Sequence, residues 1–335
     1  MGELHRTALD LVAPGKGLLA ADESAGTIAR RFDAIGVEST EDTRRAYREL
    51  LFTAPGVDAI SGVILFDETI RQSASDGTPF PELLRARGVI PGIKVDKGAK
   101  PLALAEGETV TEGLDGLRER FVEYAGLGAR FAKWRATYSI GGGRPSEYCV
   151  WTNAHALARY AALAQEAGLV PIVEPEVLMD GGHSIDDAAK ASGRALQALY
   201  TELHDQRVDL RGTLLKPNMV MSGYRAAVQA GVDEVAERTL EVLYRHVPAA
   251  VPGVVFLSGG QDDLAATAHL DAMVRRGPHP WQVSFSYSRA LQNPALASWK
   301  GDAANVAAAQ QAYAHRVAMN AAARKGGYTP ELERV

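Results

Sequence analysis

The segment GTLLKPN, residues 212–218, has the composition of a buried β-strand that ends on a charged side chain. Two leucines form its apolar run, Lys216 follows them, and Pro217 and Asn218 are residue types that end strands. A lysine is rarely buried in a protein unless an acidic group pairs with it. The segment therefore predicts a strand whose final ammonium group has a partner or a task at the strand's carboxyl end.

Seven other segments repeat this pattern of a short strand-like run followed by a longer stretch with helical features. The eight candidate strands are residues 17–22, 60–66, 90–96, 129–135, 170–176, 212–218, 253–260 and 281–287. Strands that alternate with helices predict a parallel sheet, and eight strands close a (β/α)8 barrel, or TIM barrel. A doubly wound open sheet is the alternative, but the first strand is followed by ESAGT rather than by a glycine-rich G-x-G-x-x-G turn. We therefore expect one α/β domain over residues 1–335, a TIM barrel with a parallel eight-stranded core.

Capping patterns mark the starts of several helices between these strands. Ser39 with Asp42, and Ser184 with Asp187, have the spacing of a capping box. Residues 146–167 begin with a serine, are rich in alanine and precede a glycine, which is a residue type that ends helices. These signals predict helices that connect each strand to the next.

The bulk composition excludes several classes of protein. The 335 residues carry a net charge of −5, with a pI of about 5.9, which argues against a general binder of nucleic acids or membrane surfaces. Cys149 is the sole cysteine, so no intramolecular disulfide can form, and the first residues lack the regions of a signal peptide. We therefore expect a cytoplasmic protein with neither a membrane nor a nucleic acid as its partner.

Ionisable and anion-binding groups gather at one end of the candidate strands. In a barrel the active site lies at the carboxyl ends of the strands. These ends, with the segment after the eighth strand, supply Asp22, Lys94, Lys133, Arg135, Glu174, Glu176, Lys216, Ser258, Gly259, Gly260 and Arg289. A single strand-end lysine is most often solvated or ion-paired, but so many polar groups at one end of one barrel indicate a shared pocket.

A lysine in such a pocket is suited to covalent catalysis. Crowding by other cations and desolvation lower the pKa of a lysine, and a neutral amine forms a Schiff base with a carbonyl group. Glu174 or Glu176 can exchange the protons that this reaction requires. The protonated iminium stabilises a carbanion at the neighbouring carbon, so a carbon–carbon bond can break while Asp22 takes the proton of the departing hydroxyl. Lys216 is thus predicted to bond to a carbonyl substrate.

Other groups fit an anionic substrate. The segment FLSGGQ, residues 256–261, offers glycines and backbone N–H groups after the seventh strand, where barrel phosphate sites are commonly built. Arg289 follows the eighth strand. A second basic group, made of Lys94, Arg135 and Arg31, can hold another phosphate. None of the eight histidines lies in a candidate strand and no metal-ligand motif occurs, so neither a metal nor another cofactor is expected.

With these residues assembled, the sequence resembles the class I fructose-bisphosphate aldolases. Nine motifs carry the resemblance, in order, through nearly the whole chain: GKGLLAADES (15–24), GVILFDET (62–69), GIKVDKG (92–98), GLDGL (113–117), FAKWR (131–135), PIVEPE (171–176), GTLLKPNMV (212–220), FLSGGQ (256–261) and SFSYSRALQ (284–292). The resemblance implies a TIM barrel of glycolysis and gluconeogenesis. It would cleave fructose 1,6-bisphosphate reversibly into dihydroxyacetone phosphate and glyceraldehyde 3-phosphate without a metal.

The resemblance also implies a role for each matching residue. Lys216 would be the Schiff-base lysine, Glu174 the acid and base of carbinolamine dehydration, and Glu176 its support. Lys133 would assist that step by its charge, and Asp22 would orient the substrate hydroxyl and aid bond cleavage. The substrate phosphates would lie among two sets of residues: Ser258, Gly259, Gly260, Ser286 and Arg289 around one, and Ser24, Thr27, Arg31, Lys94 and Arg135 around the other.

The chain departs from the family pattern at three places. Thr27 stands where serine is common, and it keeps the hydroxyl. Ser288 stands where glycine or alanine is usual, which keeps the backbone donor but adds a side chain. Only ELERV, residues 331–335, follows GGYTP, so the chain is expected to lack the mobile tail ending in tyrosine that assists proton transfer in many relatives. Enamine protonation would then use another group or water.

Other functions stay open on the sequence alone. The same chemistry can act on another ketose phosphate, such as fructose 1-phosphate or sedoheptulose 1,7-bisphosphate. A metal-dependent barrel lyase is an alternative of another class, and a binding or scaffolding protein built on the barrel is a third. The family is commonly tetrameric, so a homo-oligomer is expected, although the sequence identifies no interface.

Removal of residues 331–335 should leave turnover nearly unchanged, because these residues bring no tyrosine to the pocket. The measurement is a comparison of kcat on fructose 1,6-bisphosphate between residues 1–330 and the full chain. A large loss of activity in the shortened protein would contradict the expectation.

Overall fold

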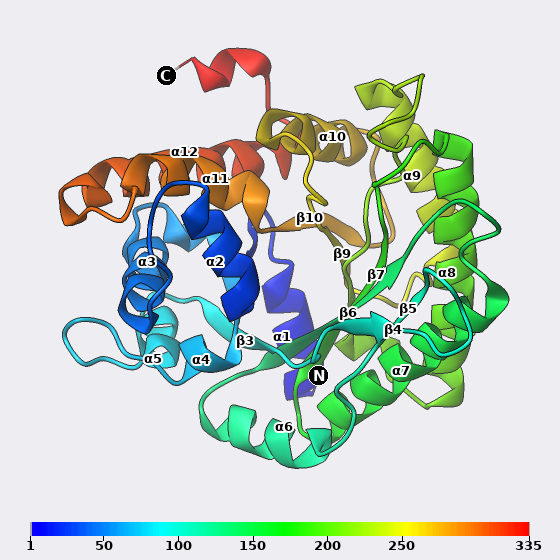
Figure 1. Ribbon diagram of the computed structural model, residues 1–335, viewed down its shortest axis with the longest axis horizontal. Coiled ribbons are helices and arrows are strands. Elements are labelled where there is room, and N and C mark those ends of the chain that lie inside the picture. Colours follow the sequence, from blue (N-terminus) through cyan, green and yellow to red (C-terminus); the bar gives the residue numbers. More distant parts are fainter. Residues whose placement is uncertain (1, 335) are drawn as a thin grey trace.

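The computed structural model describes residues 2–334, in which eight parallel strands close into a barrel (Figure 1). Following the barrel wall, they are β1 (Gly17–Ala21), β2 (Ile60–Leu65), β3 (Ile90–Lys94), β6 (Phe131–Tyr138), β7 (Val170–Val177), β8 (Leu214–Leu215), β9 (Gly253–Phe256) and β10 (Gln282–Tyr287). The wall closes where β10 pairs with β1, with Leu18 opposite Ser286 and Leu19 opposite Tyr287. The predicted TIM barrel is therefore confirmed, and the eight candidate strands occur in the predicted order.

Helices surround this barrel on its outer side (Figure 1). They are α1 (Glu3–Leu11), α2 (Ala25–Asp33), α3 (Glu41–Thr53), α4 (Asp67–Ile70), α5 (Phe80–Ala86), α6 (Leu117–Gly126), α7 (Glu147–Glu166), α8 (Ile185–Asp205), α9 (Val232–His246), α10 (Asp263–Arg275), α11 (Arg289–Trp299) and α12 (Val306–Ala323). Four single turns of 3₁₀ helix add η1 (Val57–Ala59), η2 (Leu210–Gly212), η3 (Ala303–Asn305) and η4 (Pro330–Glu333). Over residues 2–334, every helix is too short or too polar to cross a bilayer.

Two local features differ from the sequence expectation. An antiparallel hairpin of β4 (Ala99–Pro101) and β5 (Thr109–Thr111) follows β3 and was not predicted, because each strand has only three residues and β4 is exposed. The capping box expected from Ser39 is wrong: Thr40 caps α3 and exchanges hydrogen bonds with Thr43. Ser39 instead accepts hydrogen bonds from the Arg44 guanidinium. The capping box of Ser184 and Asp187 and the cap of Ser146 on α7 are confirmed.

Apolar side chains fill the amino-terminal half of the barrel interior and form a floor beneath the carboxyl ends of the strands. Inward side chains such as Ile172, Leu214 and Phe131 pack there, and α1 closes the amino-terminal end with Leu11 and Val12. Two glycines make room for this packing: a Cβ on Gly92 would lie 2.2 Å from the Phe131 ring, and one on Gly253 would lie 2.5 Å from Val12. Because the floor is dry and close-packed, polar chemistry is confined to the carboxyl end of the barrel.

The last turn of the chain is bound to the body of the protein by a buried arginine. Arg316 on α12 is 3% exposed and donates to both oxygens of Glu333, at 2.6 and 2.7 Å. His315 lies 2.8 Å from the same carboxylate. Burial raises the pKa of Glu333, but hydrogen bonds from Arg316 and His315 outweigh it and lower the pKa. The turn η4 is therefore anchored to α12.

Replacing Glu333 with glutamine should lower the free energy of unfolding by about 2 kcal/mol, because it leaves the Arg316 charge without its nearest carboxylate. Since the folded pKa of Glu333 is lowered, this stabilisation is complete above the ordinary glutamate pKa and is lost as the pH falls. Chemical denaturation at pH 7 and below pH 4 measures both effects. The exposed Glu331→Gln variant is the matched control, and equal unfolding curves for the two variants at pH 7 would contradict the assignment.

Candidate active site

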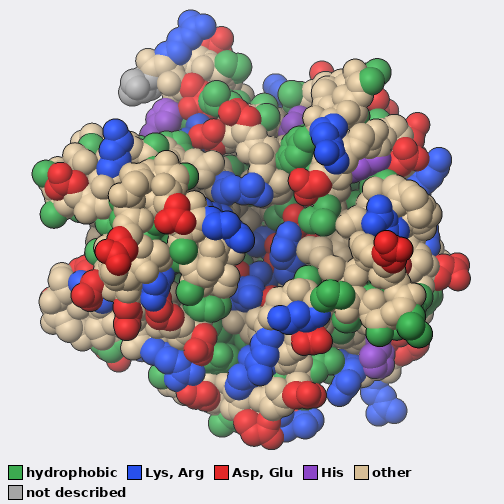
Figure 2. All heavy atoms as spheres, in the orientation of Figure 1, with side chains coloured by type: hydrophobic (Ala, Val, Ile, Leu, Met, Phe, Trp, Pro, Cys, Tyr) green, Lys and Arg blue, Asp and Glu red, His purple; other side chains and the backbone are tan. Residues whose placement is uncertain are grey.

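A cavity of about 680 Å³ opens at the carboxyl ends of the barrel strands. Figure 2 shows Lys and Arg side chains gathered in this central hollow. Of the residues predicted for the site, the cavity lining includes Asp22, Ser24, Thr27, Arg31, Lys94, Lys133, Arg135, Glu174, Glu176, Lys216, Ser258, Gly259, Ser286 and Arg289. Gly260 does not line it. The fold thus brings together side chains that are far apart in the sequence.

Lys216 is held in place by the backbone around it. β8 has only two residues, but the Lys216 N–H continues its ladder by donating to the Val173 carbonyl at 2.8 Å. Pro217 has no N–H group to donate, and beyond it the Asn218 side chain accepts the Val177 N–H at 2.8 Å. The lysine therefore stands at a fixed point above the apolar floor, with 3% of its surface exposed.

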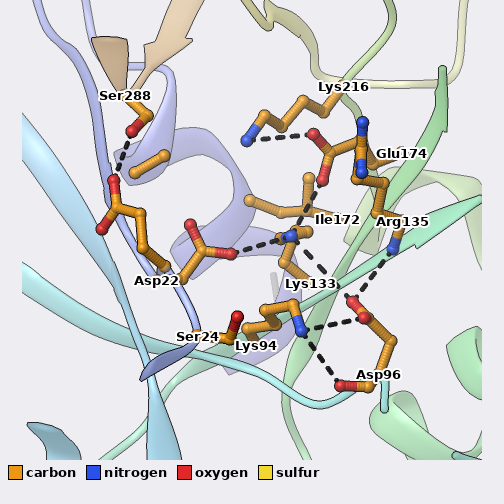
Figure 3. Close-up of polar contacts among 12 residues, drawn as sticks. Asp22, Ser24, Lys94, Asp96, Lys133, Arg135, Ile172, Glu174, Lys216 and Ser288 are labelled. Carbon is orange, nitrogen blue, oxygen red and sulfur yellow. Dashed lines mark hydrogen bonds and ion pairs between the residues drawn. The ribbon is translucent and has the colours of Figure 1, made fainter. Parts of the chain in front are cut away.

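Glu174 lies between two lysines (Figure 3). Its Oε1 is 3.3 Å from Lys216 Nζ, and its Oε2 is 3.0 Å from Lys133 Nζ. Within residues 2–334, Oε2 accepts no well-aligned hydrogen bond, so its contact with Lys133 is an ion pair that leaves a lone pair open. Burial raises the pKa of Glu174, but the charges of Lys133, Lys216 and Arg135 outweigh it and lower the pKa. Glu174 is therefore a carboxylate at neutral pH and can accept a proton.

Lys133 is the central cation of the site (Figure 3). Its ammonium lies 2.8 Å from Asp22 Oδ2, 3.0 Å from Glu174 Oε2 and 4.0 Å from Asp96 Oδ2. Burial lowers the pKa of Lys133, but these three carboxylates outweigh it and raise the pKa. Lys133 therefore stays charged and holds two reactive carboxylates a fixed distance apart.

Asp22 is the third member of this charge cluster. It follows β1, and Lys133 reaches it from β6 across the mouth of the barrel. Burial raises the pKa of Asp22, but the charges of Lys133, Lys216 and Lys94 outweigh this effect and lower the pKa to well below its usual range. Because the folded pKa is lowered, the stabilisation from Asp22 is complete above the unfolded pKa near 4 and is lost as the pH falls.

Two acidic residues of the site were missed in the sequence. Asp96 is buried two residues after β3 and pairs with Lys94 at 2.9 Å, while its Oδ2 accepts the Arg135 N–H at 3.3 Å. Glu23 is buried beside Asp22 and binds Arg31 at 2.6 Å. Both residues stand within quoted motifs, and a search for the carboxylate partners of buried lysines and arginines would have found them.

The remaining basic side chains of the cavity differ in whether a carboxylate pairs with them. Arg31 is paired with Glu23, Lys94 with Asp96, and Arg135 forms an ion pair with Glu176. In contrast, Arg289 has no carboxylate partner within residues 2–334. A free guanidinium at the cavity wall can bind a phosphate without breaking an existing ion pair.

Further groups lie around Arg289 at the same wall of the cavity. The buried Ser286 hydroxyl lines the cavity and has no hydrogen-bond partner in the described part of the chain. Gly259 and Gly260 have positive φ angles of 60° and 91°, which glycine adopts most readily. A Cβ on Gly260 would lie 2.7 Å from the Arg289 guanidinium, so this glycine lets the arginine rest against the loop. Gly260 therefore shapes the wall from behind.

The arrangement can perform amine chemistry on a phosphorylated carbonyl compound. A buried amine, an adjacent carboxylate that accepts protons and a second carboxylate on the opposite wall stand within one cavity. A search of residues 2–334 finds no group of three or more His, Cys, Asp or Glu side chains placed to hold a metal ion.

Comparisons with known proteins agree on one family. The family model described as "Fructose-bisphosphate aldolase class-I" matches residues 3–335. A relative from Xylella fastidiosa strain Temecula1, "Probable fructose-bisphosphate aldolase class 1", is 56% identical over 326 residues, which cover 97% of this chain and 98% of the relative. "Fructose-bisphosphate aldolase 6, cytosolic" of Arabidopsis thaliana is 52% identical over 328 residues, or 97% of this chain and 91% of the relative.

A solved structure of the same kind superposes closely. It is the fructose-bisphosphate aldolase of Plasmodium falciparum, in complex with TRAP and a small molecule inhibitor. The TM-score is 0.96 at 46% sequence identity, and the match covers 98% of this chain and 95% of that chain. The similarity therefore extends through the barrel and its surrounding helices.

Replacing Lys133 with methionine should raise the pKa of Asp22, because Lys133 is the strongest of the charges that lower it. The measurement is a ¹³C NMR titration of the Asp22 carboxyl carbon in the two proteins. Lys97→Met is the matched control, because Lys97 is an exposed lysine outside the cavity. An Asp22 pKa that stays the same in Lys133→Met would show that the ion pair does not set the charge state of this carboxylate.

Proposed function

Because the chain belongs to the class I fructose-bisphosphate aldolase family, we propose that it cleaves fructose 1,6-bisphosphate through a Schiff base on Lys216. The products are dihydroxyacetone phosphate and glyceraldehyde 3-phosphate, and the reaction is reversible, as glycolysis and gluconeogenesis require. The observation that carries the proposal is the buried Lys216 amine, 3.3 Å from a carboxylate and surrounded by anion-binding groups. A metal-dependent lyase would need a cluster of ligands that residues 2–334 do not contain.

The first step is a proton transfer that produces both the amine nucleophile on Lys216 and the acid form of Glu174. Glu174 takes a proton from the Lys216 ammonium, which leaves a neutral amine beside a protonated carboxyl group. The amine adds to the ketone carbon of the open-chain sugar to form a carbinolamine. Protonated Glu174 then gives its proton to the carbinolamine hydroxyl, which leaves as water and produces the iminium. Lys133 stabilises the carboxylate that results, and Glu176 supports it from the next inward position on β7.

The second step breaks the carbon–carbon bond. Asp22 removes the proton from the hydroxyl on carbon 4, that oxygen becomes the aldehyde, and the bond between carbons 3 and 4 cleaves. The electron pair of this bond moves into the iminium, which becomes an enamine. Asp22 suits this role because its lowered pKa keeps it ionised and because it faces the cavity opposite Lys216. Protonation of the enamine and hydrolysis then release dihydroxyacetone phosphate.

Two sets of side chains are proposed to hold the phosphates. Ser258, Ser286 and Arg289, with the Gly259 backbone, form the first set, supported by the free Ser286 hydroxyl and the unpaired Arg289 guanidinium. Ser24, Thr27, Arg31, Lys94 and Arg135 form the second. Two basic sets favour a bisphosphate over fructose 1-phosphate. Sedoheptulose 1,7-bisphosphate remains an alternative substrate, and relative kcat/KM values on the three sugars discriminate among them.

The wider setting is proposed on the same grounds. We expect the chain to act as one aldolase domain in the cytosol, on sugar phosphates rather than on nucleic acids or membranes, consistent with its net charge of −5. A homo-oligomer is proposed by family resemblance, with a tetramer as the expected state.

Borohydride trapping tests the mechanism directly. The protein is mixed with dihydroxyacetone phosphate and EDTA, reduced with sodium borohydride and analysed by intact and peptide mass spectrometry. A reduced adduct is expected on Lys216, and Lys216→Arg, which keeps the charge, should give no adduct there and lose at least about a thousandfold in kcat. An adduct on Lys94 or Lys133 would mean that the nucleophile is misassigned. No adduct, together with activity lost in EDTA, would favour a metal-dependent lyase.

A further inference from the structure

Ser288 begins α11 but does not cap it. Serine is favoured at this position because its oxygen usually accepts a backbone N–H of the first turn. In this protein the Ser288 side chain makes no capping hydrogen bond. Its hydroxyl instead donates to Glu23 Oε1 and accepts from Arg31 Nη1 at 3.0 Å and from Gln292 Nε2 at 3.2 Å. The hydroxyl therefore serves the cavity wall rather than the helix (Figure 3).

Glu23 is the fixed centre of this network. Its Oε1 accepts from Arg31 at 2.6 Å and from Gln292 at 3.0 Å in addition to Ser288, and its Oε2 accepts from Arg48 at 2.6 Å. The carboxylate is buried, as is Arg48, and Gln292 is tied to the Ala20 carbonyl at 2.7 Å. Burial raises the pKa of Glu23, but Arg48 and Arg31 outweigh it and lower the pKa, so Glu23 remains an acceptor.

This network fixes one end of the Arg31 guanidinium and leaves the other end free. Arg31 Nη1 donates to both Glu23 and Ser288, while its Nε and Nη2 donate to no protein group within residues 2–334. Arg31 and Ser288 both line the cavity, and Ser288 directly precedes Arg289. The Ser288 hydroxyl thus links Arg31 on α2 to the start of α11, whose first residue is Arg289.

We propose that Ser288 is a positioning residue that holds Arg31 ready for a substrate phosphate. This inference rests on the proposed function, because Ser288 and Arg31 line the cavity in which the substrate is proposed to bind. Without the hydroxyl, Arg31 Nη1 keeps only its hydrogen bond to Glu23, so the guanidinium is held less firmly. Substrate then has to order this side chain on binding, which weakens affinity and leaves the chemical step alone.

Steady-state kinetics on fructose 1,6-bisphosphate tests the proposal. Ser288→Ala should raise KM about 3- to 10-fold with kcat changed less than twofold, because one long side chain loses its preorganisation. Ser288→Thr keeps the hydroxyl and should restore most of the affinity, and Ser288→Gly repeats the test by removing the whole side chain. The matched control is Ser298→Ala, on the same helix, where the hydroxyl donates only to the Pro294 carbonyl and lies outside the cavity.

A double-mutant cycle separates a positioning role from a structural one. In an Arg31→Ala background, Ser288→Ala should change KM less than twofold, because the group it positions is gone. Multiplicative effects of the two substitutions, or an unchanged KM in both Ser288→Ala and Ser288→Gly, would overturn the inference. Failure of the proposed function is distinct from this, because the unmodified protein would then not cleave fructose 1,6-bisphosphate at all.

Discussion

Charge pairing across the mouth of the barrel is the constraint on which the site depends. An ionised side chain removed from water is costly unless an opposite charge compensates it. Lys133 on β6 finds its closest carboxylate, Asp22, at the end of β1, and β2 and β3 separate these two strands along the wall. Only closure of the sheet brings the two ends within 2.8 Å. The barrel therefore makes the charge cluster possible, and the cluster in turn requires the barrel to be closed.

The sequence predicted the barrel because its signals are local and repeated. Each strand is a short apolar run, and a helix with its own signals follows most of them. Asp96 and Glu23 were missed because the role of a buried carboxylate depends on partners that are distant in the sequence. Asp96 lies near Lys133 on β6, and Glu23 binds Arg48 on α3. The short β4–β5 hairpin was missed because three residues are too few to show an alternating pattern, and β4 is exposed. Ser39 and Thr40 are adjacent candidates for the cap of α3, and Thr40 takes this position while Ser39 accepts hydrogen bonds from Arg44 in the same helix.

Asp22 and Glu23 are adjacent residues after β1, but they have different partners. Asp22 and Glu23 both line the cavity, but Asp22 meets Lys133, whereas Glu23 binds Arg48 and Arg31. Asp22 is paired with Lys133, whereas Glu23 accepts hydrogen bonds from protein donors on both of its oxygens. The contrast shows why residue type alone does not identify a catalytic acid: the hydrogen bonds that a group has already made decide what remains for a substrate.

The seam between β1 and β10 also governs how the chain reaches its native state. Leu18 and Ser286 are paired neighbours, yet 268 residues separate them in the sequence (286 − 18). During synthesis at roughly 5–20 residues per second, β10 is made about 15–50 s after β1. Until then, the edge of β1 that pairs with β10 lacks its backbone hydrogen bonds. The apolar face of α1 also stays uncovered during this time, because the barrel interior against which it packs includes Leu214 and Val255. Such long-range pairing slows folding, so the first strand of the barrel depends on protection from aggregation until the last one emerges.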